Sequence, residues 1–321
     1  MSKTPGYLYT LAVRVSSGGA HQDTIYQKVG IRHVEVKGSQ LLVNGKAVYL
    51  RGFGKHEDQD IRGRSLDQAT ILKDFNLIKW IGANSFRTSH YPYSEAIMDE
   101  ADSQGIIVID EVPAVGLSEF NSVMLNLHKH TINELIERDK NRPSVFMWSI
   151  ANEPASSKPE AKAYFETIAD LARSTDPAKR PITGAINADY HSDHMALSLD
   201  VLMINRYFGW YSDTGFPQVI QGKIVADLTH FHEKFKKPVM VSEYGADTIA
   251  GLHTEPSFIF SEDYQTEFMV EYHRGFDALR SKGFFIGEHI WNFADFMTKQ
   301  QISRVGGNKK GIFTRDRQPK T

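Results

Sequence analysis

Two glutamates stand at the ends of apolar runs and could act together in catalysis. Glu153 follows the run in WSIANEP, and Glu243 follows the run in VSEYG. A carboxylic acid that is protonated near neutral pH and a second carboxylate that is ionised can serve as general acid and nucleophile, the pair that glycoside hydrolysis uses. Each motif alone is a weak signal, because a glutamate at a strand end can simply pair with an arginine.

The elements that must position these glutamates are predicted from an alternation that begins near Gln40. Short apolar runs occupy 47–54, 84–90, 106–111, 145–153, 181–186, 201–208, 238–245 and 284–293, with amphipathic segments such as 67–82, 93–105, 128–141 and 160–176 between them. Strand–helix alternation indicates an α/β fold with a parallel sheet, and eight repeats favour a (β/α)8 TIM barrel. A doubly wound sheet is the alternative, but the glycine fingerprint that usually follows its first strand is not visible.

The two ends of the chain follow other patterns. Residues 7–15 and 25–38 alternate between apolar and polar side chains around the break SSGGAHQDT, which predicts antiparallel strands. Two or three strands rarely form a stable sheet alone. We therefore expect residues 1–36 to be the last strands of a truncated β-sandwich domain and residues 37–321 to be the catalytic barrel. The tail after 293 is rich in Gly and Lys, so we expect the closing barrel helix to be missing.

Polar side chains gather where the predicted strands end, which is where a TIM barrel carries its active site. They are Lys55, His56, Glu57, Asp58, Arg87, Ser89, His90, Asp110, Glu111, Asn152, Glu153, Asn205, Arg206, Tyr207, Glu243, Tyr244, Trp291, Asn292 and Asp295. So many carboxylates, imidazoles, guanidinium groups and aromatic rings predict a polar ligand that carries hydroxyl groups. On strands four and seven, the two glutamates are expected to face one another across the barrel mouth.

Some of these residues have plainer interpretations. Asp110 and Glu111 are interpreted as structural groups that pair with Arg87 or Arg62, and His90 could either contact a ligand or form a hydrogen bond at the barrel mouth. The consecutive residues 56–58 (His-Glu-Asp) could bind a metal, but neighbours on an extended segment point alternately, so no metal site is expected.

Two further features of the sequence lie outside the strand ends. The histidines at 128 and 130 are expected to be solvent-facing or at the edge of the core, because residues two apart do not share a helix face. The pair Lys309-Lys310, taken without its context, would be an exposed turn.

The composition limits the classes of partner. The chain has 321 residues, with 37 Lys plus Arg against 39 Asp plus Glu, and a formal net charge of −2. Balanced charge argues against a nucleic-acid partner, and no apolar stretch approaches the ~18 residues of a membrane-spanning helix. The sequence contains no cysteine, which excludes disulfides, thiol catalysis and thiolate metal sites.

Longer motifs resemble those of a known family. WSIANEP, SEYG, FRTSHYPY, GEHIWNFADF and GGNKKGIFTRDRQPK are similar to motifs of the β-glucuronidases of glycoside hydrolase family two. The resemblance covers the last strands of the family's immunoglobulin-like domain and most of its barrel. It implies a retaining exo-glycosidase that hydrolyses β-D-glucuronides, either glycosaminoglycan ends or glucuronide conjugates, by double displacement through a covalent glycosyl-enzyme and without a cofactor.

The resemblance also implies roles for particular residues. Glu153 would be the acid/base and Glu243 the nucleophile, which Tyr207 would orient. The implied substrate-binding residues are Asn152, Tyr207, Tyr211, His90, Trp291, Arg304, Asn308 and Lys310. Among them, Asn308 and Lys310 belong to the family's N-x-K motif, which grips the C6 carboxylate of glucuronic acid. The physical reason is that a carboxylate needs a cation and an amide donor, whereas a neutral hexose does not.

Other interpretations stay open at this point. A β-galactosidase-like or β-mannosidase-like hydrolase of the same family would share the glutamate pair, and a truncated, non-catalytic sugar-binding fragment would share the fold. The expected partner is a small-molecule or oligosaccharide glucuronide, with no nucleic acid and no membrane. The family resemblance also suggests a homotetramer. The short segment 113–131, with NEPAS and DTIAGLH, is closer to animal enzymes, which implies the lysosome, whereas a bacterial source would imply the cytoplasm.

Overall fold

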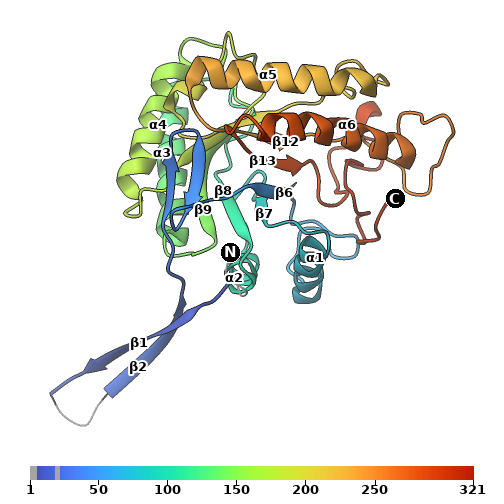
Figure 1. The fold of residues 1–321 in the computed structure, drawn as a ribbon. Coiled ribbons are helices and arrows are strands. Elements are labelled where there is room, and N and C mark those ends of the chain that lie inside the picture. Colours follow the sequence, from blue (N-terminus) through green and yellow to red (C-terminus); the bar gives the residue numbers. More distant parts are fainter. Residues whose placement is uncertain (1–5, 19–21) are drawn as a thin grey trace.

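A computed structural model describes residues 6–18 and 22–321, apart from the side chain of Ser303, and contains a closed barrel of eight parallel strands (Figure 1). The strands are β6 (Leu50–Gly54), β7 (Ser85–Arg87), β8 (Ile107–Glu111), β9 (Val145–Asn152), β10 (Ile182–Ile186), β11 (Leu202–Asn205), β12 (Val239–Glu243) and β13 (Phe285–Ile290). They pair in chain order, and β13 pairs with β6 to close the ring. Each predicted run holds one barrel strand, so the predicted (β/α)8 barrel is confirmed.

Helices cover the outside of the barrel (Figure 1). They are α1 (Gln68–Trp80), α2 (Glu95–Gln104), α3 (Ser122–Asp139), α4 (Ala161–Thr175), α5 (Ile220–Phe235) and α6 (Glu262–Arg280), with the short 3-10 helices η1 (Met195–Ser198) and η2 (Pro217–Val219). Short polar residues start several of them: the Asp67 carboxylate accepts hydrogen bonds from two backbone N–H groups of α1, as N-cap residues do. None of the helices in the described part of the chain has both the length and the apolar character of a membrane span.

Two apolar cores lie on opposite sides of the barrel wall. Successive side chains of a strand point to opposite faces, so β8 sends Ile107 and Ile109 into the barrel and Val108 outward against the helices. The inner core consists largely of Leu50, Ile107, Ile109, Met147, Met203, Met240 and Ile286. By the same alternation Glu111, at the end of β8, points inward at the barrel mouth. The strand period thus decides which polar residues reach the candidate site.

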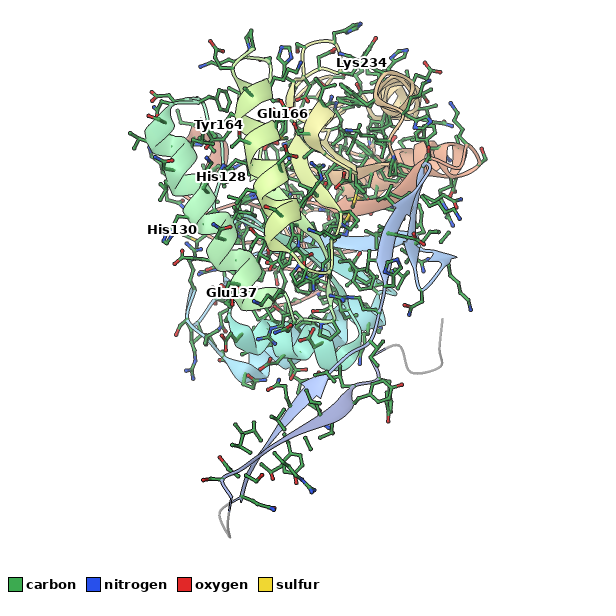
Figure 2. All side chains as sticks on the ribbon, turned by 90° about the vertical axis from the view of Figure 1, so that its left-hand side faces the viewer. His128, His130, Glu137, Tyr164, Glu166 and Lys234 are labelled. Carbon is green, nitrogen blue, oxygen red and sulfur yellow. The ribbon has the colours of Figure 1, made fainter. Side chains whose placement is uncertain are left out.

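The histidines of α3 have different environments. His128 is buried, and its Nδ1 lies 3.1 Å from the hydroxyl oxygen of Tyr164 on the neighbouring helix α4 (Figure 2). His130 is exposed, with its Nε2 3.3 Å from a carboxylate oxygen of Glu134. The expected exposure is confirmed for His130 and wrong for His128, because α4 packs over the α3 face that carries His128.

The first strands form two small antiparallel sheets. The hairpin of β1 (Tyr9–Ser16) and β2 (Gln22–Val29) projects away from the barrel (Figure 1). The second sheet, formed by β3 (Val34–Lys37), β4 (Gln40–Val43) and β5 (Lys46–Ala47), packs against the barrel. The predicted antiparallel strands are confirmed, while part of the predicted turn, residues 19–21, lies outside the described residues. The domain division between residues 36 and 37 falls within β3 and stays a prediction.

The segment after β13 is irregular but firmly attached. Within residues 291–321, the described part contains one helical element, the 3-10 helix η3 (Ile302–Arg304), and backbone bridges join Phe296 to Asn308 and Phe313 to both Ala294 and Pro319. Buried ion pairs fasten its end, since Lys320 lies 2.8 Å from an oxygen of Asp295. This loop-like segment therefore contributes buried groups to the C-terminal end of the barrel.

Candidate active site

The two predicted catalytic glutamates lie at the C-terminal ends of β9 and β12. Glu243 is the last residue of β12, and Glu153 directly follows β9. Glu153 has a φ of 48°, and its backbone N–H donates to the carbonyl oxygen of Ala185 at 2.9 Å. This left-handed conformation costs a non-glycine residue about 1–3 kcal/mol and is often found at functional sites.

Hydrogen-bond donors hold both oxygens of the Glu243 carboxylate. The hydroxyl group of Tyr207 donates to Oε2 at 2.6 Å, and Nη2 of Arg87 donates to Oε1 at 2.5 Å. The Glu243 residue is only 4% exposed. These donors fix the orientation of the carboxylate. Its two oxygens contact a hydroxyl group and a guanidinium group, an arrangement that suits a nucleophile.

Glu153 has neutral partners instead of cations. Nδ2 of Asn205 donates to Oε1 at 2.7 Å, and Nδ2 of Asn187 donates to Oε2 at 3.3 Å. Burial and the negative charge of Glu243 raise the pKa of the Glu153 carboxyl, and the Asn205 hydrogen bond opposes them. The hydrogen-bonded side chains of Asn205, Asn152 and Arg87 connect the two glutamates, which therefore share one site. Within this site, the surroundings of Glu153 favour the protonated carboxyl.

Arg87 connects Glu243 to a second, fully buried carboxylate. Its Nη1 donates to both oxygens of Glu111 at 2.8 Å, and the Ser149 hydroxyl donates to the same carboxylate at 2.6 Å. Burial by itself would raise the pKa of Glu111, but Arg87 and His90 together lower it to about 2. The predicted pairing of Glu111 with Arg87 is confirmed.

The predicted pairing of Asp110 with Arg87 or Arg62 is wrong. Asp110 points to the outside of the barrel, where it accepts a hydrogen bond from the Thr88 hydroxyl at 3.1 Å. Burial and the neighbouring carboxyl of Asp139 raise its pKa. Arg62 pairs with Asp67 at the surface instead. The physical reason is strand alternation, which separates adjacent residues 110 and 111 onto opposite faces of the wall.

Three predicted sugar-binding residues lie beside the glutamates. The rings of His90 and Trp291 are stacked, with centroids 5.0 Å apart and planes 17° apart. The His90 Nδ1 lies 2.8 Å from an oxygen of Glu111, and its Nε2 lies 4.0 Å from Glu243. The Asn152 side-chain oxygen accepts from Nη1 of Arg87 at 3.4 Å. The structure thus gathers these residues at one place, while their contacts with substrate stay predictions.

The predicted carboxylate-binding residues form a cluster next to these groups. Lys310 has no exposed side-chain area, and its ammonium is paired with Asp247, whose Oδ2 also accepts from Nη1 of Arg304 at 3.1 Å. The Asn308 side-chain oxygen accepts from the Lys310 backbone N–H at 2.9 Å. The interpretation of Lys309-Lys310 as an exposed turn is therefore wrong for Lys310, because a buried carboxylate draws its ammonium inward.

Aromatic rings surround the Lys310 ammonium. Its Nζ lies 4.8 Å from the ring centroid of Tyr211, 5.0 Å from that of Trp210 and 5.9 Å from that of Tyr207. Burial lowers the pKa of Lys310 to about 8. The group formed by Lys310, Arg304, Asn308 and Asp247 is called the lysine cluster below. Because Tyr207 also donates a hydrogen bond to Glu243, one side chain separates this cluster from Glu243. The lysine cluster and Glu243 therefore lie on either side of the Tyr207 side chain.

The residues of the His56-Glu57-Asp58 segment have separate partners. The His56 ring packs against Trp291, a Glu57 oxygen accepts from the Ser94 backbone N–H at 2.8 Å, and Asp58 pairs with an arginine of the C-terminal segment. Among the residues that the structure describes, no group of three or more histidines and carboxylates is arranged to hold a metal ion.

Sequence reasoning missed several residues of the site. The sequence predicts Arg87 only as an ion-pair partner of a structural carboxylate and Asn205 only as a polar strand end, and it does not single out Asn187 or Asp247. Asn187 directly follows the fifth predicted strand, so its position was a usable signal. Asp247 lies in a loop four residues after Glu243, and nothing in the sequence shows that it meets Lys310.

Comparison with known proteins identifies the class of protein that carries this fold and site. Residues 34–321 match the sequence model of the family described as glycosyl hydrolases family 2, TIM barrel domain. The chain therefore belongs to glycosyl hydrolase family 2.

Within that family the chain is similar to β-glucuronidases. It is 50% identical over 327 residues to the enzyme of Paenibacillus borealis, covering 98% of this chain and 54% of the relative. It is 48% identical over 327 residues to the enzyme of Homo sapiens, covering 100% of this chain and 50% of the relative. The chain thus spans about half the length of these curated relatives, which come from bacteria and animals, and its cellular compartment stays a prediction.

Solved structures give the same result. The β-D-glucuronidase of Dictyoglomus thermophilum superposes with a TM-score of 0.93 at 48% identity, covering 98% of this chain and 56% of that one. The β-glucuronidase of Bifidobacterium dentium, complexed with coumarin-3-O-glucuronide, superposes with a TM-score of 0.94 at 45% identity, covering 99% of this chain and 53% of that one.

Proposed function

We propose that this chain is the catalytic barrel of a retaining exo-β-glucuronidase that works without a cofactor. The observation that carries the proposal is the asymmetry of the two glutamates. Glu243 accepts hydrogen bonds from Arg87 and Tyr207, whereas Glu153 has only amide partners and a raised pKa. One glutamate is thus set up to attack and the other to hold a proton, as glycoside hydrolysis requires.

In the proposed first step, Glu243 attacks the anomeric carbon of the glucuronide. The glycosidic C–O bond breaks while Glu153 transfers its proton to the departing oxygen, and a covalent glycosyl-enzyme forms on Glu243. Arg87 and Tyr207 hold the attacking carboxylate in place through the hydrogen bonds described above. Asn152 would contact the sugar 2-hydroxyl, and Trp291 would offer its face to the sugar ring.

In the proposed second step, Glu153 acts as a base. The glycosyl ester removes the negative charge of Glu243, one of the two causes that raise the pKa of Glu153. The pKa of Glu153 then falls, so the residue can take a proton from water, whose oxygen attacks the anomeric carbon. The carbon–Glu243 bond breaks, and the sugar leaves with its original anomeric configuration.

The lysine cluster supports a uronic acid as substrate. Lys310, Arg304 and Asn308 bring an ammonium, a guanidinium and an amide together, and the ammonium lies 5.9 Å from the ring centroid of Tyr207, which donates a hydrogen bond to Glu243. A C6 carboxylate can use these groups, whereas the neutral C6 hydroxyl of a galactoside or mannoside would leave the cations without an anionic partner. The proposed substrates are small-molecule and oligosaccharide glucuronides. The homotetramer and the lysosomal or cytoplasmic location stay predictions from the family resemblance.

Hydrolysis of a chromogenic glucuronide tests the proposal. Glu243→Gln removes the attacking carboxylate but keeps the shape of the side chain, so turnover should fall by about 10³-fold or more. His130→Gln, on the exposed face of α3, is the control and should keep wild-type turnover. A Glu243→Gln variant with nearly wild-type turnover would disprove the nucleophile assignment, and a folded wild-type chain with no turnover would disprove the activity.

A further inference from the structure

Asp247 has no part in the mechanism described above, yet one of its oxygens joins both cations of the lysine cluster. The residue is 4% exposed and lies four positions after Glu243. Its Oδ2 accepts from the Lys310 ammonium and from Nη1 of Arg304, at 3.1 Å for Arg304. Its Oδ1 accepts from the backbone N–H of Lys309 at 2.8 Å. One buried carboxylate therefore fixes two side chains and the backbone of the motif that carries them.

Without this carboxylate the two cations would oppose each other. The charged and titratable groups that face the Lys310 ammonium are Asp247, Arg304, Glu243, Tyr207 and Tyr211. Burial and the like charge of Arg304 disfavour a charged ammonium at this position, whereas Asp247 and Glu243 favour it. With two cations and Asp247, the cluster carries one net positive charge, which a single substrate carboxylate can neutralise.

The position of Asp247 in the chain also connects the cations of the lysine cluster to Glu243. The loop that carries it continues directly from β12, whose last residue is Glu243. The Thr248 backbone N–H donates to the Lys309 carbonyl oxygen at 2.9 Å, so this loop and the N-x-K motif are joined by backbone as well as by charge. The distance between the nucleophile and the cations is therefore set by a short, buried stretch of chain.

Resting on the proposed glucuronidase activity, we propose that Asp247 is a positioning residue, which holds the Lys310 ammonium and the Arg304 guanidinium side by side at a fixed distance from Glu243. The C6 carboxylate of the substrate binds to the pair that Asp247 has assembled. Asp247 touches neither the reacting atoms nor the sugar, and it acts through Lys310 and Arg304.

Asp247→Asn tests the charge of this residue with little change in shape. Since Lys310 has a pKa of about 8 with Asp247 present, loss of the negative charge lowers that pKa further. The pH at which KM for a chromogenic glucuronide begins to rise should move by at least about one unit toward acid. At pH 8 we expect KM to increase about fivefold or more, because a shift of one unit lowers the protonated fraction of Lys310 from about one half to about one tenth, while kcat at saturating substrate stays within about threefold.

Asp295→Asn is the matched control. It breaks the buried Asp295–Lys320 pair of the same C-terminal segment without removing a partner of the Lys310 ammonium. A general loosening of the segment would alter both variants, whereas the proposed role predicts that Asp295→Asn keeps the wild-type pH dependence of KM. An Asp247→Asn variant whose KM follows the wild-type pH profile overturns the inference.

A second variant decides the matter if Asp247→Asn does not fold. Asp247→Glu keeps the charge but lengthens the side chain, so the cations are displaced while their protonation is supported. We expect a raised KM for the glucuronide with the wild-type pH dependence, and an unchanged KM overturns the inference. A wild-type chain that does not hydrolyse the glucuronide refutes the proposed function instead, so the two failures are distinguishable.

Discussion

Replacement of Arg87 by glutamine should destabilise the protein in a pH-dependent way. Arg87 is fully buried and bonds two carboxylates, Glu111 and Glu243. The pKa of Glu111 is lowered from its ordinary value of 4.5 to about 2, with Arg87 as the main cause that opposes burial. Since each pKa unit corresponds to about 1.4 kcal/mol, this ionised carboxylate contributes about 3 kcal/mol of stability at pH 7.

The sign of the pH dependence follows from the lowered pKa. The contribution of Glu111 is fully present above its unfolded-state pKa, near 4.5, and is lost as pH falls toward its folded-state value of about 2. In Arg87→Gln the buried carboxyl lacks its cation, so its pKa rises and its ionised form becomes unfavourable. The free energy of unfolding should therefore fall by about 3–5 kcal/mol at pH 7, and by less as pH approaches 3.

Urea denaturation at pH 7, 5 and 3, followed by circular dichroism, measures this difference. Arg62→Gln is the control, because Arg62 is largely exposed and its pair with Asp67 should contribute less than about 1 kcal/mol. The reasoning is refuted if Arg87→Gln loses less than about 1 kcal/mol at pH 7, or if its deficit relative to the wild type is the same at all three pH values.

Two further predictions concern specificity and the acid. Lys310→Ala should reduce kcat/KM for a chromogenic glucuronide by about 10–100-fold, because a charge-assisted hydrogen bond contributes about 1.5–3 kcal/mol. The rate on the matching galactoside should stay nearly unchanged. Equal losses on both substrates would contradict a carboxylate-specific role. Activity should fall as pH rises through the raised pKa of Glu153. Asn205→Ala should move this alkaline limb of the kcat/KM profile to higher pH, because the Asn205 hydrogen bond lowers the pKa of Glu153. A limb that stays in place or moves to lower pH would show that Glu153 is not the titrating acid.

The candidate catalytic centre was largely predictable because its signals are local. Glu153 and Glu243 each end an apolar run, and strand ends in a parallel barrel converge on one face. Their different environments were not predictable in the same way. The Asn205 and Asn187 donors that act on Glu153 come from β11 and from the residue after β10, so the register in which β9, β10 and β11 pair decides that they reach Glu153.

Errors in the sequence-based interpretation share one cause. Asp110 faces the helices and His128 is buried against α4, although the sequence suggested an arginine partner for the first and an edge position for the second. In both cases the partner that a side chain meets is decided by which element packs on its face. Sequence spacing gives the period of a strand or helix but not the identity of the neighbour.

The sequence by itself determined the eightfold alternation of strands and helices, the family, and the placement of two glutamates at strand ends, because a period of two or 3.6 residues and a linear motif need no distant contact. Only the tertiary structure decided that Lys310 is buried and that Asp247 is its partner. That pair joins residues far apart in the chain, and its strength depends on the exclusion of water, which exists only once the barrel and its C-terminal segment have packed together.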